Sequence, residues 1–120
     1  LIEYFAYLEI GDHANAKISL RYANQNKPVN RWPSPVVDYL QDLIGASKLI
    51  SFVTNTAQET EAHTYIGLKL RSAGLGEGIN KHLEWVSRHG DRRVFEYNLA
   101  HVMNLKERVA LLEFQSETNF

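Results

Sequence analysis

The sequence predicts an α+β fold in which two ββα units share one antiparallel four-stranded, saddle-like sheet, with helices on one face and further helices at the C-terminus. Three observations predict this fold: apolar alternation with a period of two in four segments, a helix signal after each pair of segments, and the same order of elements twice. The chain has 120 residues, of which 44% are hydrophobic and 22% charged. These values are typical of a single compact domain, so we expect residues 1–120 to share one core.

The first predicted unit begins with two strands. Residues 2–10 (IEYFAYLEI) alternate between apolar positions such as Ile2 and Ile10 and a second face that carries Phe5. Residues 17–23 (KISLRYA) alternate in the same way. The intervening GDHANA segment is typical of a turn, so the two strands are expected to form a hairpin.

A helix is predicted at residues 34–45 (SPVVDYLQDLIG). Ser34 is a favourable N-cap, Pro35 suits the first helical position, and Gly45 lies beyond the end. These signals close the first unit.

The second predicted unit repeats this order. Residues 48–55 (KLISFVTN) and 63–72 (HTYIGLKLRS) are predicted strands, and residues 76–90 (GEGINKHLEWVSRHG) are a predicted helix that Gly90 closes. The repeat predicts that four strands form one sheet whose apolar face the helices cover.

Two further helices are predicted at the C-terminus. Residues 91–103 fit both a helix and a strand, and the helical interpretation is preferred. Residues 104–114 (NLKERVALLEF) fit a helix in which Asn104 is the N-cap and Glu107 completes a reciprocal capping pair. The predicted core of the whole fold consists of Ile18, Leu20, Leu40, Leu43, Ile66, Leu68, Leu70, Leu83 and Leu112.

The outward face of the second and fourth strands is predicted to bind nucleic acid. It would carry basic, hydroxyl and aromatic side chains without a carboxylate among them: Lys17, Ser19, Arg21, Tyr65, Lys69 and Arg71. Lysine and arginine neutralise phosphates, and arginine also reaches guanine edges in the major groove. The partner expected from this pattern is double-stranded DNA or structured RNA.

Composition excludes several other classes of protein. The absence of cysteine excludes a disulfide framework and thiolate metal sites, and it agrees with an intracellular location. No apolar run approaches the length of a membrane span, so no membrane partner is expected. The net charge of −1 means that any basic surface must be local.

The segments SPVVDYLQDLIGASKLISFV, TYIGLKLRSAGLGEGINKHLEWV and NLKERVALLEF resemble the later part of a LAGLIDADG homing-endonuclease domain. The resemblance implies a saddle-shaped sheet along the DNA major groove, DNA cleavage, and Mg²⁺ held by carboxylates. Asp12 in YFAYLEIGDHA would take the place of the catalytic acid, although its turn-like setting favours a local capping role. The namesake helix is not seen before the first strand. A dimer, or a companion segment upstream of Leu1, is therefore a further expectation.

A second resemblance is to GIY-YIG nucleases, through KLISFV followed by TYIG. It implies that Tyr65 lies at an active site, that Arg71 or His82 assists, and that Glu113 binds the metal. A three-letter motif is common by chance, so a purely structural role for Tyr65 is favoured.

Three functions therefore stay open at the level of the sequence. The first is a homing-type DNA endonuclease or its degenerate relative, and the second is a non-catalytic nucleic-acid-binding splicing cofactor. The third is a small-ligand or protein-interaction domain whose sheet packs against a partner chain.

Overall fold

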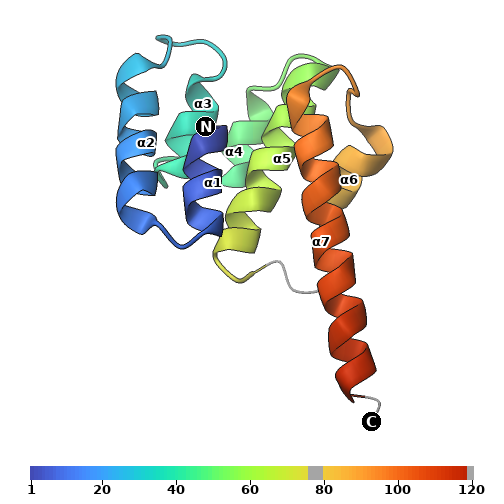
Figure 1. Cartoon of the computed structure of the whole chain (residues 1–120). Helices are drawn as coiled ribbons and strands as arrows, with labels where there is room; N and C mark the ends of the chain where they lie inside the picture. Colours follow the sequence, from blue (N-terminus) through green and yellow to red (C-terminus); the bar gives the residue numbers. More distant parts are fainter. Residues whose placement is uncertain (76–79, 119–120) are drawn as a thin grey trace. The chain divides into compact units, whose positions relative to one another are not determined.

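The computed structural model describes residues 1–75 and 80–118, and these residues form seven helices and no strand (Figure 1). The chain divides into two compact units, Leu1–Val53 and Thr54–Phe120. Each unit is described by itself below.

The predicted four-stranded sheet, and with it the α+β class, is wrong. The four segments predicted as strands lie in helices α1 (Ile2–Glu9), α2 (His13–Asn26), α4 (Ala46–Ser51) and α5 (Thr56–Ser72). In α1 the buried residue is Phe5, which the strand register had placed opposite Ile2 and Ile10, and those two side chains are exposed. Short apolar alternations are ambiguous because a helix can bury any one of these residues through its own spacing of three or four.

Helices α1 and α2 form a hairpin in the first unit. Gly11 adopts the left-handed conformation, with φ of +76°, in the short turn between them. Asp12 then caps α2, because its side chain accepts a hydrogen bond from the backbone N–H of Asn15 at 3.1 Å. The GDHANA segment is therefore a turn, as predicted, but it joins two helices.

The predicted helix at 34–45 is present as α3 (Ser34–Leu40), which is shorter than expected. Pro33 occupies the N-cap position and Ser34 is the first helical residue, while Gly45 is the N-cap of α4. The buried apolar side chains of this unit are Phe5, Ala16, Val36, Val37, Tyr39, Leu40 and Leu49.

The second unit consists of α5, α6 (Lys81–His89) and α7 (Phe95–Thr118), and each helix packs against the other two (Figure 1). Helix α6 ends before Gly90, as predicted; residues 76–79 of the predicted helix lie outside the described residues. The two predicted C-terminal helices are one continuous helix. Asn104 is not an N-cap, because it is buried in the middle of α7.

Helix α5 is the central helix of this unit. Five consecutive residues, 64–68, are buried because α6 and α7 cover α5 on more than one side. At Gly67 a methyl group would lie only 2.6 Å from Cδ2 of Leu83, so the glycine permits the close approach of α5 and α6. Asn80, which caps α6, also donates its side-chain amide to the carbonyl of Gly67 at 2.9 Å.

The predicted core residues therefore have mixed outcomes. Four are buried as predicted: Leu40, Ile66, Leu68 and Leu83. Two are half-buried, Leu20 and Leu70. The remaining three are exposed: Ile18, Leu43 and Leu112. Leu112 is exposed because it lies on the face of α7 that no other described helix covers.

Candidate functional site

The residues predicted to bind nucleic acid fall into two groups on different units. Lys17, Ser19 and Arg21 lie in α2, where Lys17 and Arg21 are exposed one helical turn apart and Ser19 is half-buried. The other three, Tyr65, Lys69 and Arg71, lie in α5. The shared sheet face that was expected to join the two groups does not exist.

The α5 group contributes to packing within the second unit. Tyr65 is buried, and its hydroxyl donates to Oε1 of Glu96 on α7 at 2.9 Å. Burial, followed by the neighbouring charge of Glu96, raises the pKa of Tyr65. Arg71 pairs with Glu107 of α7 at 2.7 Å, and Lys69 is half-buried.

Asp12 takes the capping role described above. Hydrogen bonds from the side chain and backbone of Asn15 lower the pKa of its carboxyl group. Across residues 1–75 and 80–118, no group of three or more His, Cys, Asp or Glu side chains is arranged to hold a metal ion. No described helix is both long and apolar enough to cross a membrane.

Two imidazoles meet between α5 and α6. The Nδ1 atoms of His63 and His82 lie 2.9 Å apart, and the ring of Trp85 lies against His63 with centroids 4.4 Å apart. Burial, and then the proximity of His82, lowers the pKa of His63 to about 4. Burial also lowers the pKa of His82. The pair can share one proton in a hydrogen bond, whereas two imidazolium rings at this distance would repel each other.

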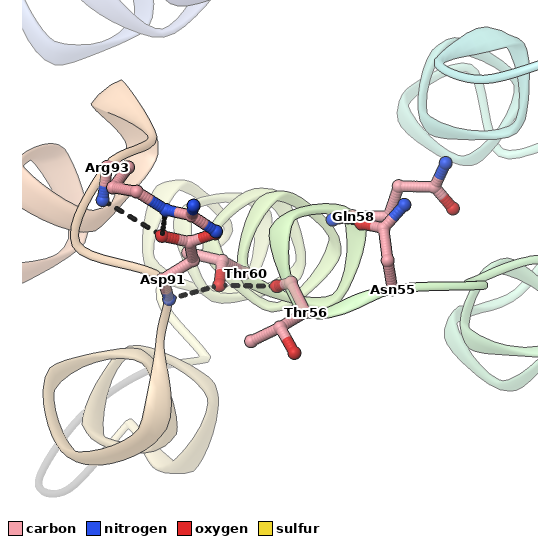
Figure 2. A network of polar contacts seen from close by, with 6 residues as sticks. All are labelled: Asn55, Thr56, Gln58, Thr60, Asp91 and Arg93. Atoms are coloured by element: carbon pink, nitrogen blue, oxygen red, sulfur yellow. Dashed lines mark hydrogen bonds and ion pairs between the residues drawn. The ribbon is translucent and has the colours of Figure 1, made fainter.

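A polar network fixes the start of α7 relative to α5 (Figure 2). The hydroxyl of Thr60, which is fully buried, donates to the carbonyl of Thr56 and accepts from the backbone N–H of Asp91, both at 2.7 Å. The carboxylate of Asp91 in turn accepts two hydrogen bonds from the guanidinium of Arg93, with N···O distances of 2.9 and 3.0 Å. These contacts have a structural role, because they join the loop before α7 to the side of α5.

Helix α7 is attached to its unit through apolar and polar residues: Ala100 has no exposed surface, Leu99, Met103 and Leu111 are half-buried, and Asn104 is buried. Asn104, buried at the centre of this inner face, donates to Oε2 of Glu84 on α6 at 2.9 Å, and Arg108 donates to the same oxygen at 2.7 Å. The hydrogen bond from Arg108, followed by that from Asn104, lowers the pKa of Glu84 to about 2. Farther along the same face, Glu107 pairs with Arg71.

The opposite face of α7 is apolar and exposed. Residues at alternating spacings of three and four follow it: 95, 98, 102, 105, 109, 112 and 116. We call this set the outer stripe. Its apolar members are Phe95, Val102, Leu105, Val109 and Leu112, which are 57%, 51%, 49%, 52% and 64% exposed.

The C-terminal turns of α7 extend beyond α5 and α6 (Figure 1). Residues 112–117 are all exposed. Isolated helices of this length are marginal in water, so these turns need support from packing that the other described helices do not supply.

No family model, curated protein or solved structure matches this chain. The candidate site must therefore be argued from its own residues. The outer stripe is the strongest candidate, because large apolar side chains form a continuous surface instead of isolated exposed positions.

The sequence predicted that Leu112 of this stripe lies in the core. The signal that identifies the site is the continuation of the same spacing to Val102 and Phe95 across Asn104, which was interpreted as a helix start. His82 and Glu113, which the second nuclease resemblance implied as site residues, lie on different helices. His82 on α6 faces His63, and Glu113 is exposed on α7.

Proposed function

We propose that this chain is a self-associating protein-interaction module in which α7 of one copy packs against α7 of a second copy. One observation carries the proposal: in addition to the face that packs against its own unit, α7 presents to solvent a second face with large apolar side chains at spacings of three and four. An ordinary surface helix has its apolar stripe only on the side that faces its own core. A repeat with spacings of three and four is the pattern by which two helices pack along a shared seam.

The size of the effect supports a reversible dimer. Burying a large aliphatic side chain contributes about 1.5 to 3 kcal/mol. Five half-exposed side chains in each of two copies then contribute on the order of 10 kcal/mol, against an association cost of about 4 to 15 kcal/mol. At the low end of that cost about 6 kcal/mol remains, which corresponds to a dissociation constant between micromolar and millimolar.

A second copy is favoured as the partner because the charges beside the outer stripe complement those of an identical helix. Arg108 and Glu113, both exposed, flank the stripe on its two sides. Opposite charges on the two flanks allow each copy to offer a cation to the acid of the other.

Sedimentation velocity over a wide range of protein concentration tests the proposal. The wild-type mass should rise from the 13.8 kDa of one chain toward twice that value. The double variant Leu105→Lys/Val109→Lys should stay at the mass of one chain with its helical circular dichroism retained, because both side chains are exposed in the unit. Ile18→Lys, which changes an exposed apolar residue of α2, is the matched control and should dimerise like the wild type. A wild-type mass of one chain at every concentration would overturn the proposal.

A second candidate function is binding of duplex DNA through α2. The observation that favours it is that the fourteen residues of α2 include no acid, while Lys17, Arg21 and Tyr22 are exposed. An α-helix fits the major groove, where arginine and lysine contact phosphates and guanine edges.

Fluorescence anisotropy with a labelled duplex at increasing salt tests this second candidate. Lys17→Ala/Arg21→Ala should weaken binding and reduce the salt dependence by about two units of slope, since each phosphate contact contributes about one. Lys48→Ala, at an exposed position of α4, is the control. Equal affinity of the wild type and the α2 variant at low salt would reject this function.

A further inference from the structure

We infer that His63 of α5 and His82 of α6 together bind one divalent transition-metal ion of the class that imidazole prefers, such as Cu²⁺, Ni²⁺ or Zn²⁺. This inference is independent of the proposed self-association, because both residues lie outside α7. It rests on the position of two ring nitrogens, on the packing that holds them there, and on their access to solvent.

The Nδ1 atoms of the two rings face each other. They lie 2.9 Å apart, whereas the ring centroids are 5.2 Å apart, so each Nδ1 lies on the side of its ring nearer the other ring. Two nitrogens that bind one tetrahedral ion at about 2.0 to 2.1 Å lie about 3.3 Å apart. A separation of the rings by about 0.4 Å and a small turn of each ring would therefore direct both lone pairs at one ion. The ion takes the place of the hydrogen bond between the rings, and the ring that donates this bond then carries its proton on Nε2.

Helix packing holds the two histidines in place. His63 lies one turn before Gly67, and His82 directly precedes Leu83, so the pair lies beside the close approach of α5 and α6. The ring of Trp85 lies against that of His63, with centroids 4.4 Å apart, and limits the rotation of His63 to small turns. Two ligands on packed helices lose little conformational freedom when they bind an ion.

Both rings are available to an ion from solution. An imidazole must be neutral to bind a metal, and burial lowers the pKa of both histidines, so both rings are neutral at pH 7. Each side chain is only half-buried, which leaves the ion a path from solvent to the pair.

The number and type of ligands set the expected affinity and selectivity. Among residues 1–75 and 80–118 no third histidine, cysteine, aspartate or glutamate completes the site, so water fills the remaining positions. With half the ligands of a structural zinc site, the expected dissociation constant is about 1 to 200 µM. Cu²⁺ should bind more tightly than Ni²⁺ or Zn²⁺, and Mg²⁺ should not bind, because it prefers oxygen ligands.

Fluorescence quenching of Trp85 tests the site, because a paramagnetic ion bound to His63 lies beside the indole. Trp32→Phe leaves Trp85 as the single tryptophan of the chain. Ni²⁺ added to this full-length chain, without a histidine tag, should quench the fluorescence along a one-site curve. Mg²⁺ at the same concentrations should leave the fluorescence unchanged.

Histidine variants in this background assign the quenching to the pair. His63→Gln and His82→Gln should each raise the dissociation constant for Ni²⁺ by about tenfold or more, because each removes one of two ligands. His89→Gln is the matched control: His89 is exposed on α6 with its ring 5.8 Å from that of Trp85, so an ion bound there would also quench. This variant should stay within about twofold of its parent. An equal effect of His89→Gln, or undiminished quenching in His63→Gln/His82→Gln, would overturn the inference.

Nuclear magnetic resonance of the wild-type chain with Zn²⁺ gives a readout that does not depend on the folding of any variant. The imidazole nitrogen signals of His63 and His82 should move together as Zn²⁺ is added. Those of His13 and His101, which are exposed on α2 and α7, should change little over the same range. Unchanged signals of His63 and His82 at about 1 mM Zn²⁺ would overturn the site, because the expected affinity predicts near saturation there.

Discussion

Replacing Gly67 with alanine should destabilise the second unit, although alanine is the better helix former. Gly67 lies inside α5, where a change from glycine to alanine ordinarily stabilises a helix by about 0.5 to 1 kcal/mol. Here the added methyl group would lie 2.6 Å from Cδ2 and 2.7 Å from Cγ of Leu83. Carbon atoms in favourable contact lie about 3.5 to 4.0 Å apart, so the helices would need to separate by about 1 Å.

The expected cost follows from the surroundings of that contact. Leu83 has no exposed surface, so it cannot move without displacing other core atoms. Overpacking a buried site by a methyl group typically costs about 1 to 3 kcal/mol. After the gain in helix propensity is subtracted, we expect the free energy of unfolding to fall by about 1 to 2 kcal/mol.

Urea denaturation followed by circular dichroism measures this change, and two further variants make the result specific. Gly45→Ala is the control for the added methyl group, because no heavy atom lies within 4 Å of it, and it should lower stability only by the preference of the α4 N-cap for glycine over alanine, about 0.5 kcal/mol. In the double variant Gly67→Ala/Leu83→Ala, the space left by the leucine should accommodate the new methyl group. The double variant should therefore lose about 1 kcal/mol less free energy of unfolding than the two single variants lose together. Wild-type or higher stability of Gly67→Ala, or strict additivity with Leu83→Ala, would refute the close approach of α5 and α6.

Three further changes test the polar contacts of the second unit. Thr60→Val should lower the free energy of unfolding by about 1 to 3 kcal/mol, because it leaves the N–H of Asp91 without its acceptor; Thr60→Ser should restore most of this loss, and equal losses would argue against the hydrogen bond. Glu84→Gln should cost about 1 kcal/mol at pH 7. Because the pKa of Glu84 is lowered to about 2, its contribution is present above pH 4.5 and lost as the pH falls toward 2, so the two proteins should converge in urea midpoint there. The pKa of His63 is lowered to about 4 because burial favours the neutral ring, whereas the pKa of Glu84 is lowered because hydrogen bonds favour its charged form. For His63 too, the free energy of unfolding is highest above pH 6.5 and falls as the pH is lowered toward 4. Solvent screening around this half-exposed ring limits the loss to about 1 to 2 kcal/mol, and His63→Gln should reduce it; an unchanged pH profile would contradict the assignment.

Some helix ends are easier to recognise in the sequence than the fold class is. Asp12, Asn55 and Asn80 each cap a helix through a hydrogen bond to the residue three positions later. Such contacts join residues that are close in the sequence, so they depend little on the rest of the chain. Gly11 and Gly90 mark a turn and a helix end for the same reason.

Alternation of apolar residues led to the wrong fold class because it is ambiguous over short segments. Tyr65, Ile66 and Leu68 are all buried, which a strand with one covered face does not allow. The central position of α5 between α6 and α7 produces this burial, and no pattern within residues 63–72 encodes that position. The shared sheet face predicted for the basic residues of 17–21 and 65–71 is wrong for the same reason, whereas nucleic-acid binding itself stays a prediction.

The sequence by itself indicated the turn at Gly11 and the helix end at Gly90, and it already contained the spacing of the outer stripe. The tertiary structure alone decided which face of each helix is covered. In α7, the burial of Ala100, the hydrogen bond from Asn104 to Glu84 and the pairing of Glu107 with Arg71 attach one face to the unit, and the outer stripe on the other face is left exposed. The physical reason is that periodicity identifies the residues that share a face, whereas burial depends on which other helix lies against that face, and this follows only from the packing of residues distant in the chain.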